Sequence, residues 1–324
     1  MDTNEIYDVA VVGGGPAGLS GALTLGRSRR SVVVIDAGQP RNAPAAAVHG
    51  FFTRDGTPPR ELLAAGRAEV ERYGVRLVDG EVVDVVAGDG RFDLALAGGA
   101  TIAARRLLVA GGLVDELPAI PGVAELWGDQ VIHCPYCHGW EARDRAVGVL
   151  ASGPMATHQA QLFRQLSDDV VVFAHTHPPS AEQRADLAAR GIPVVEGEVA
   201  ALDMADGRLT GVRLADGTTV AREVVVVAPR FVARSHLLEK LGVEVVEHGP
   251  GVGMRVDADA TGRTNVPGVW VAGNVTDLSA QVVVAAAAGM TAGAHINADL
   301  VASDRSGGAH RHMGLSAPPE TPAP

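Results

Sequence analysis

The chain has two cysteines, Cys134 and Cys137, and only two residues separate them. Two cysteines one turn apart at a helix start can close a disulfide ring, and the helix N-terminus stabilises one thiolate. One sulfur can then meet an electron acceptor while the other exchanges with a substrate thiol. We therefore predict a redox-active dithiol and no metal site. The alternatives are an inert pair or a zinc site completed by His133 and His138, although the chain has no second CxxC pair.

Two further side chains of this segment can handle protons. His138 follows Cys137 directly, and an imidazole titrates near neutral pH, so it can take a proton from a thiol or return it. Alternatively, His138 only caps or orients the helix. Glu141 is either a second acid–base group or a first-turn carboxylate that favours the helix dipole. We expect His138 to be the acid–base partner of the dithiol.

A glycine-rich turn near the N-terminus has the pattern G-x-G-x-x-G at Gly13, Gly15 and Gly18, between a strand and a helix. Gly13 permits a tight turn, Gly15 lets the backbone approach a pyrophosphate, and Gly18 lets the helix pack on the strand. The helix N-terminus offers free N–H groups to phosphates. Asp36 ends the next strand, where a carboxylate can accept hydrogen bonds from ribose hydroxyls. The motif predicts a dinucleotide site; a turn that binds nothing is the alternative.

A second, poorer turn reads Ala151-x-Gly153-x-x-Ala156. Ala151 adds a methyl group at the tight turn, and Pro154 removes one N–H donor. An NADPH site needs arginines after the following strand to bind the 2′-phosphate, but the nearest, Arg184, lies beyond two prolines. NAD(P)H binding is therefore doubtful here. His175 and His177 of this loop are predicted to be exposed.

The predicted elements occur twice in the order strand, turn, helix, strand. The first set is Asp8–Val12, Leu19–Gly26 and Ser31–Ile35, and the second is Ala146–Leu150, Met155–Leu166 and Val170–Phe173. A hairpin and a buried strand follow each set, at Arg91–Ala103 with Leu107–Ala110 and at Leu209–Val220 with Val224–Ala228. The same interval separates Val9 from Val32 and Val147 from Val170. We predict an α/β fold with two Rossmann-like dinucleotide-binding domains of the three-layer ββα type; chance similarity is the alternative.

These elements predict a discontinuous first domain at residues 1–117 and 245–302, completed by a strand at Gly268–Ala272 and a helix from Ala280 to about Leu300. Residues 118–244 form the second domain and carry the cysteine pair. Residues 303–324, rich in Gly, Pro, Ser and His, are predicted to be a disordered tail in which His310 and His312 are solvated.

The composition narrows the classes further. The chain has 324 residues, 47% of them hydrophobic, which suits two domains and excludes global disorder. Its net charge of −11 argues against nucleic-acid binding. Two cysteines cannot make the disulfide framework of a secreted fold. The N-terminus lacks the basic start of a signal peptide, and no apolar run is long enough for a membrane span. We expect a cytoplasmic protein.

Together these residues resemble the low-molecular-weight thioredoxin reductases, over roughly residues 6–300. The resemblance rests on the first glycine motif, Ala110-Gly111-Gly112, the CxxC in the second domain, and the stretch 264–274, TNVPGVWVAGN. That stretch resembles the second FAD motif of the family, which usually ends in Gly-Asp; here Asn274 keeps an acceptor without the charge. The resemblance implies a homodimer with FAD across the first domain.

The resemblance also implies roles for individual residues. Cys137 faces the flavin, Cys134 attacks the substrate, and His138 stands where the reductases usually carry an acidic aspartate. The implied FAD contacts are Gly13, Gly15, Pro16, Ala17 and Gly18 around the pyrophosphate, Asp36 at the adenosine ribose, Arg41, Asn42 and His49 in the flavin-lining loop, Ala110 and Gly111, Gly273 and Asn274, and the pair Gln281 and Val282.

Three departures point to one branch of that family: the weak second glycine motif, the missing arginine cluster, and histidine after the CxxC. With the segment CPYCHGWE (134–141) they resemble FAD-dependent dithiol oxidases, which close disulfides in sulfur-containing natural products. In that branch electrons pass from a small-molecule dithiol through the CxxC to flavin and then to O2, without NADPH. The alternatives are an NAD(P)H-dependent reductase of a thioredoxin-like protein and a flavin-bound redox sensor with little turnover.

Overall fold

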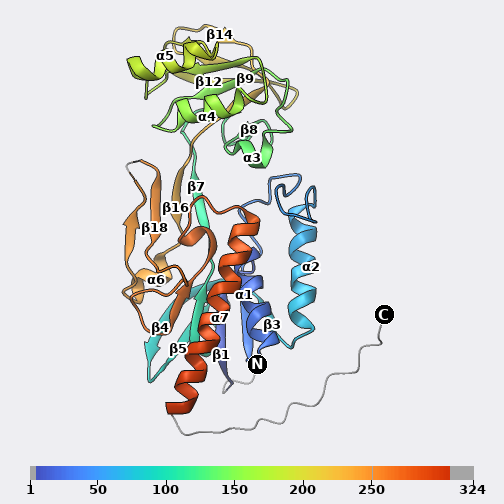
Figure 1. Ribbon diagram of the computed structural model, residues 1–324, viewed down its shortest axis with the longest axis vertical. Coiled ribbons are helices and arrows are strands. Elements are labelled where there is room, and N and C mark those ends of the chain that lie inside the picture. Colours follow the sequence, from blue (N-terminus) through green and yellow to red (C-terminus); the bar gives the residue numbers. More distant parts are fainter. Residues whose placement is uncertain (1–4, 250, 307–324) are drawn as a thin grey trace, which may run out of the picture.

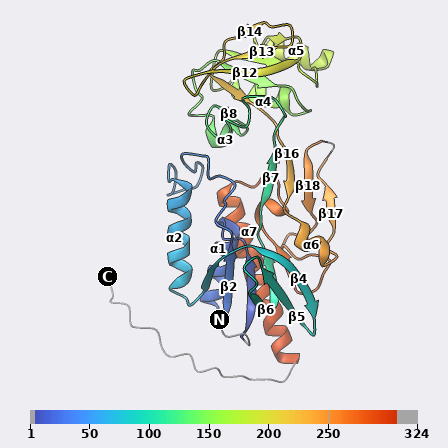
Figure 2. The ribbon, with the colours of Figure 1, turned by 180° about the vertical axis from the view of Figure 1, so that it is seen from behind.

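Two units joined by two antiparallel strands make up the fold, as the computed structural model shows (Figure 1). The structure describes residues 5–249 and 251–306. The joining strands are β7 (Leu113–Glu116) and β16 (Arg230–Ala233). We call residues 5–117 with 230–306 the N-terminal unit, and residues 118–229 the inserted unit. The two units face each other at the end of the N-terminal unit from which β7 and β16 lead to the inserted unit (Figures 1 and 2).

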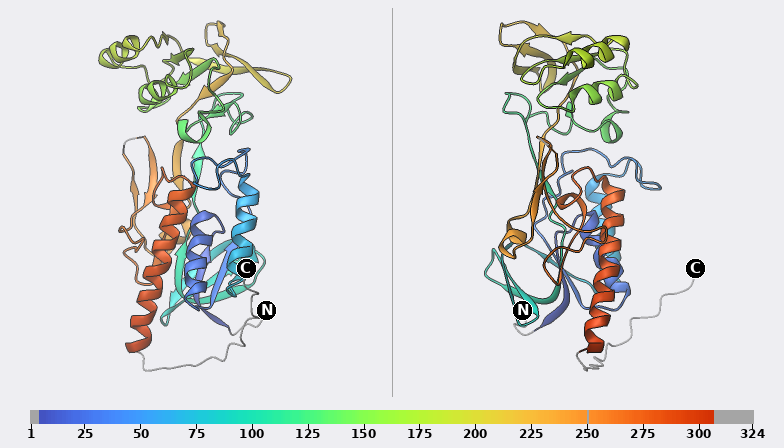
Figure 3. Two further views of the ribbon diagram at one scale, coloured as in Figure 1. Left: turned by 45° about the vertical axis from the view of Figure 1, so that its right-hand side comes forward. Right: turned by 60° about the vertical axis from the view of Figure 1, so that its left-hand side comes forward.

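The N-terminal unit is built on a sheet in the order β3-β2-β1-β6-β5-β4, with β19 beside β6. Its strands are β1 (Ile6–Val12), β2 (Val32–Asp36), β3 (Arg76–Asp79), β4 (Val82–Gly88), β5 (Arg91–Leu96), β6 (Thr101–Val109) and β19 (Val269–Val271). The helices α1 (Pro16–Arg27), α2 (Pro59–Glu71) and α7 (Val282–Ser306) lie on one face of it (Figure 3). The antiparallel strands β4 and β5 curl over the other face and give the predicted three layers.

Helices α1 and α7 lie in close contact because glycines line their interface. A Cβ at Gly289 would lie 1.9 Å from the carbonyl oxygen of Ala17, and one at Gly293 would lie 2.8 Å from that of Gly21. This approach holds the first turn of α1 against the start of the long C-terminal helix.

The inserted unit has a parallel sheet in the order β11-β10-β9-β15-β8. Its elements are β8 (Val131–Ile132), α3 (Pro135–His138), β9 (Val147–Leu150), α4 (Ala156–Phe163), β10 (Val170–Phe173), α5 (Ala181–Ala189), β11 (Val194–Val195) and β15 (Val224–Val226), with a separate sheet of β12 (Val199–Ala205), β13 (Arg208–Leu214) and β14 (Thr219–Val220). Val9 pairs with Val32, and Val147 pairs with Val170. The predicted repeat of two Rossmann-like units is confirmed.

The chain returns to the N-terminal unit earlier than the predicted boundary at residue 244. β16 joins a four-stranded sheet, β17-β18-β16-β7, with β17 (Val245–Glu247) and β18 (Gly253–Val256), and α6 (His236–Lys240) follows it. Leu237, Leu238 and Val243 are buried in the core of the N-terminal unit. Residues 230–244 therefore pack there, because the apolar side chains after β15 belong to its core.

Two further boundaries differ from the prediction. The separate strand predicted at Leu107–Ala110 is the second half of β6, which is continuous from Thr101. Helix α7 extends to Ser306, so residues 303–306 are helical; the rest of the predicted tail, with His310 and His312, lies outside the described residues. Within the described ranges, no helix is both long and apolar enough to cross a membrane.

Candidate active site

A cavity of about 1610 Å³ lies between the two units and is lined by both. It exceeds the roughly 300–1,000 Å³ of a drug-sized ligand pocket and so suits an extended ligand. The predicted site residues that line it are Gly13, Gly15, Pro16, Ala17, Asp36, Arg41, Asn42, His49, Ala110, Gly111, Cys134, Cys137, His138, Gly273, Asn274, Gln281 and Val282. The remaining predicted site residue, Gly18, does not line it.

The first glycine turn forms an open cradle at one end of the cavity. Helix α1 begins at Pro16, and Gly15 precedes it without a side-chain cap, so the first N–H groups of the helix are free for a ligand. A Cβ at Gly15 would meet no atom within 4 Å. Gly13 has φ +106° and lies against the backbone of Ala110, which only glycine permits.

Gly18 supports this cradle from beneath. It is buried, and a Cβ there would lie 1.9 Å from the carbonyl oxygen of Gly13. Its role is the packing of α1 on the turn. Gly18 is not among the residues that line the cavity, and the contact with a pyrophosphate that the resemblance implies for it stays a prediction.

Asp36 faces the cavity and also fixes the turn. Its Oδ1 accepts a hydrogen bond of 3.1 Å from the backbone N–H of Gly14, and its Oδ2 lies 3.5 Å from Arg67 Nη1. Arg67 comes from α2 and was not predicted, since a single arginine in a helix carries no site signal. The carboxylate is therefore held in place before any ligand arrives.

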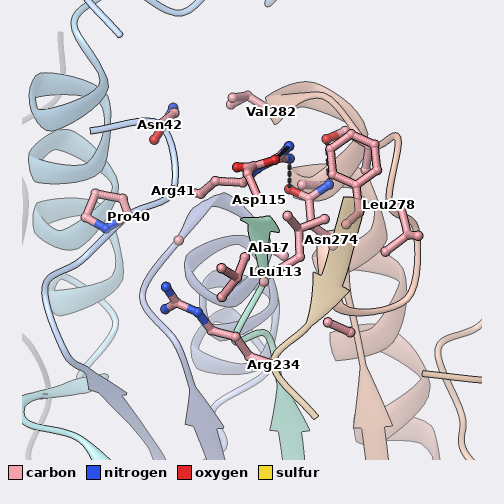
Figure 4. A pocket seen from close by; sticks show the side chains of 18 of the residues that line it. Ala17, Pro40, Arg41, Asn42, Leu113, Asp115, Arg234, Asn274, Leu278 and Val282 are labelled. Atoms are coloured by element: carbon pink, nitrogen blue, oxygen red, sulfur yellow. Dashed lines mark hydrogen bonds and ion pairs between the residues drawn. The ribbon is translucent and has the colours of Figure 1, made fainter. Parts of the chain in front are cut away.

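Arg41 lies at the centre of the cavity wall (Figure 4). It donates two hydrogen bonds to the Asp115 carboxylate, at 2.8 and 2.6 Å, and its Nη1 lies 3.4 Å from Asn274 Oδ1. Its guanidinium also stacks 5.2 Å from the ring centre of Phe231. Asp115 on β7 and Phe231 on β16 were missed by sequence analysis. They tie the predicted flavin-lining loop to the two joining strands.

The two cysteines lie together at the start of α3, with Cys134 as the residue that precedes the helix. Cys137 Sγ donates to Cys134 Sγ at 2.7 Å, and the amide of Gln281 lies 4.0 and 3.9 Å from the two sulfurs. This hydrogen bond is the main reason that the pKa of Cys134 falls to about 6, and backbone N–H groups of α3 add to it. The same interaction, with burial, raises the pKa of Cys137. Cys134 is therefore the thiolate of the reduced pair.

We expect Cys134 of the reduced protein to be alkylated with a pH midpoint near 6. Only the thiolate reacts, so the rate should be flat above this pH and fall below it, whereas an ordinary thiol has its midpoint near ~8.5. Cys137→Ala removes the strongest hydrogen-bond donor and should move the midpoint upward. Iodoacetamide labelling under argon, read by peptide mass spectrometry, measures both values. A midpoint near ~8.5 in the unsubstituted protein would contradict this assignment.

His138 follows Cys137 in sequence and lines the same cavity. It ends α3, and its Nε2 is buried with no hydrogen-bond partner among the described residues. Burial lowers the pKa of His138, the Glu141 carboxylate opposes that shift, and His49 adds to it. The imidazole is therefore neutral near pH 7 and free to accept a proton.

His133, on the other side of the cysteines in sequence, is occupied structurally. Its Nδ1 lies 3.0 Å from the carbonyl oxygen of Val227, and the side-chain amide of Gln159 donates a hydrogen bond of 3.1 Å to the backbone carbonyl oxygen of His133. Its ring packs edge-on against Phe231.

Across residues 5–249 and 251–306, no three His, Cys, Asp or Glu side chains are grouped to hold a metal ion. Gln159, which is 3% exposed, was not predicted because a lone glutamine in a helix carries no signal.

The second glycine turn is hydrogen-bonded to the loop beside it, and a Cβ at Gly153 would meet no atom within 4 Å. Ala151 is fully buried, and its carbonyl oxygen accepts the backbone N–H of His177 at 3.0 Å. Arg184 pairs with Glu196 and donates to the carbonyl oxygen of Pro179. His177 is exposed as predicted, but His175 is not, because its Nδ1 accepts the N–H of Val199 at 3.1 Å and burial lowers its pKa.

Comparisons with known proteins agree with this architecture. The family described as pyridine nucleotide-disulphide oxidoreductase matches residues 7–289. Thioredoxin reductase tcpT of Claviceps purpurea (strain 20.1) is 33% identical over 319 residues, 93% of this chain and 97% of that protein. The crystal structure of HlmI is 47% identical with a TM-score of 0.88, covering 94% of this chain and 95% of HlmI. An oxidoreductase from Agrobacterium tumefaciens is 36% identical with a TM-score of 0.85, covering 92% and 99%.

Proposed function

Because this chain belongs to the pyridine nucleotide-disulphide oxidoreductase family, we propose that it oxidises a small-molecule dithiol to a disulfide through Cys134 and Cys137, with O2 as the electron acceptor. Membership of this family implies FAD as the cofactor, and its thioredoxin reductase-like relatives support thiol-disulfide oxidoreductase activity. The substrate class and the acceptor are the parts of the proposal that go beyond the family.

The residues of the cavity fit FAD. The open cradle at Gly15 and the free N–H groups of α1 suit a pyrophosphate, and the Asp36 carboxylate at the end of β2 suits a ribose. The Arg41 and Asn274 side chains would line the rest of the cofactor's path toward the cysteines. When bound there, FAD would supply the two-electron acceptor for the Cys134–Cys137 dithiol, with O2 as the final acceptor that leaves as peroxide.

Two thiol exchanges at Cys134 account for the substrate chemistry. A substrate thiol gives its proton to His138, and its thiolate attacks Cys134 Sγ of the Cys134–Cys137 disulfide, which expels Cys137 as a thiolate. The second substrate thiol gives its proton to the Cys137 thiolate, and its own thiolate then attacks the substrate sulfur of this mixed disulfide, which closes the product disulfide. Cys134 leaves in that step, and its pKa of about 6 makes it a good leaving group.

The poor donor set of the second turn is the observation that carries the choice of electron donor. The buried carbonyl oxygen of Ala151 is bonded to His177, Pro154 contributes no N–H, and Arg184 is already paired with Glu196. A nicotinamide nucleotide would find few N–H donors at this turn, and the Arg184–Glu196 pair would have to open before that arginine could bind its phosphate. This favours a dithiol as the electron donor, with NAD(P)H unnecessary.

A reductase that uses NADPH or NADH to reduce a thioredoxin-like protein is the second candidate. The parallel order of β11-β10-β9-β15-β8 favours it, since that sheet has the topology of a nucleotide-binding unit. Curated relatives named thioredoxin reductase favour it too. A flavin-bound redox sensor would show bound FAD and a titratable disulfide without multiple turnover. In each case we propose a homodimer.

Anaerobic titration of the purified holoprotein separates these candidates. We expect dithiothreitol to bleach the flavin absorbance stoichiometrically, NADPH and NADH to leave it unchanged, and readmitted air to restore it with consumption of O2. Cys134→Ser should block bleaching by the dithiol. Rapid bleaching by either nucleotide would make the reductase reading correct, and no O2 uptake with excess dithiol would refute the oxidase.

A further inference from the structure

A row of titratable side chains runs from the CxxC segment across the gap between the units. His49 Nε2, on the loop between β2 and α2, lies 3.5 Å from Glu141 Oε1 of the inserted unit. His49 Nδ1 lies 3.4 Å from Asp55 Oδ1, which also accepts the N–H of Gly50 at 2.9 Å. Figure 1 shows this loop facing α3. The row leads outward, since the side chains of His49, Glu141 and Asp55 are 24%, 48% and 68% exposed.

Glu141 shares a helical face with His138. The helical hydrogen bonding of α3 continues past its end, because Gly139 N–H bonds to the carbonyl oxygen of Pro135 and Ala142 N–H to that of His138. Residues three apart on such a turn are neighbours. The charged and titratable groups that face His138 are Glu141 from its own segment and His49 from the opposite unit, with the Cys137 thiol beside it in sequence.

We propose that Glu141 and His49 are positioning residues that lead the proton taken up by His138 out to Asp55 and solvent. This inference rests on the proposed function, because the proton comes from a substrate thiol. The S–H bond breaks, its electron pair stays on sulfur, and the proton binds His138. The imidazolium then gives up one proton to the Glu141 carboxylate, from which it passes to His49, and from His49 to the Asp55 carboxylate and water.

The electrostatics of His138 suit this route. Burial and His49 lower its pKa, which makes the imidazolium a ready proton donor, and the negative charge of Glu141 raises it. Without Glu141 as a proton acceptor, the partly buried imidazolium could lose its proton only to a water molecule that diffuses to it. A purely mechanical role is the competing explanation, because the same His49–Glu141 contact bridges the two units, as the packing of Gly128 against Pro44 also does.

Glu141→Gln separates a proton route from a mechanical contact. In single-turnover bleaching by dithiothreitol, the acid limb of the pH profile should move to lower pH, because His138 loses a negative neighbour. The plateau should fall about 10-fold, short of the ~10²–10⁴-fold attributed to a general base in direct contact. Added imidazole buffer should restore the plateau. Asp144→Asn is the matched control, since it removes a carboxylate from the same turn that makes no hydrogen bond or ion pair among the described residues; its profile should equal that of the unsubstituted protein.

An unchanged acid limb and plateau in Glu141→Gln would overturn the inference, as would a lowered plateau that imidazole does not restore. Histidine NMR titration of the holoprotein tests it without turnover. Glu141→Gln should lower the pKa of His138, because it removes a negative neighbour, and His49→Gln should raise it. If the unsubstituted protein is not bleached by any dithiol, the proposed function fails; if His138 titrates identically in Glu141→Gln, this inference fails by itself.

Discussion

Replacing Cys137 by serine is expected to reduce dithiol-driven turnover by about 10⁴–10⁶-fold, the scale seen when an essential covalent group is removed. One sulfur cannot form the Cys134–Cys137 disulfide that receives the substrate's electrons. The FAD content should be unchanged, because the cradle at Gly15 and the carboxylate of Asp36 belong to the N-terminal unit. Turnover with O2 and the flavin-to-protein ratio measure the two effects.

Cys134→Ser is the matched variant, and the two should differ in how they react with disulfides. In Cys137→Ser, Cys134 retains the contacts with backbone N–H groups of α3 and should form a stable mixed disulfide with 5,5′-dithiobis(2-nitrobenzoate). In Cys134→Ser, the remaining Cys137 should react more slowly at neutral pH, because burial raises its pKa. Retained turnover in either variant, or equal trapping in both, would contradict the assigned roles.

The local pattern of this sequence was sufficient to predict the repeated strand–turn–helix–strand units. The equal spacing of Val9 and Val32 and of Val147 and Val170 became an equal register in two sheets. That inference succeeds because a buried parallel strand must be a continuous apolar run, and the turn before the helix must contain glycine. Both constraints act within a few residues of one another.

The partners of short strands could not be predicted in this way. β16 is four residues long and follows β15 closely, so its apolar residues are compatible with either sheet. Hydrophobic period specifies that a segment is a strand but not which strand it pairs with. Only the burial of Leu237, Leu238 and Val243 in the core of the N-terminal unit shows that the chain has returned to that unit by β16.

The site was predicted where a motif carried it and missed where a pair of distant residues carried it. The glycine turn, Asp36 and the cysteines each have a local signature. The Arg41–Asp115 and His49–Glu141 contacts join residues far apart in the sequence, each an ordinary charged residue in its own segment. Such pairs leave no periodic trace, since the Arg41–Asp115 contact exists only once the loop after β2 meets β7, and the His49–Glu141 contact only once the two units face each other.

The second large effect is expected at the glycine turn, where Gly18→Ala should destabilise the protein and release FAD. A methyl group at Gly18 would lie 1.9 Å from the carbonyl oxygen of Gly13, and backbone cannot yield as a flexible side chain does. Overpacking of this kind typically costs about 1–3 kcal/mol, and each kcal/mol lowers the Tm of a domain of ~150–250 residues by about 2–4 °C. The melting temperature of the FAD-free protein measures the packing cost directly.

Gly15→Ala separates the packing of the turn from its binding of a ligand. Gly15 has φ −75°, which alanine adopts freely, and an added Cβ meets no protein atom within 4 Å, so the FAD-free melting temperature should not change. The same methyl group occupies the approach of a pyrophosphate to the N-terminus of α1, so the Kd for FAD should rise about tenfold or more, equivalent to ~1.4 kcal/mol. Reconstitution of the FAD-free variant by fluorescence titration gives this Kd. A lower melting temperature with unaltered FAD affinity would show that the turn is a packing device, and the cradle for FAD would then have to lie elsewhere in the cavity.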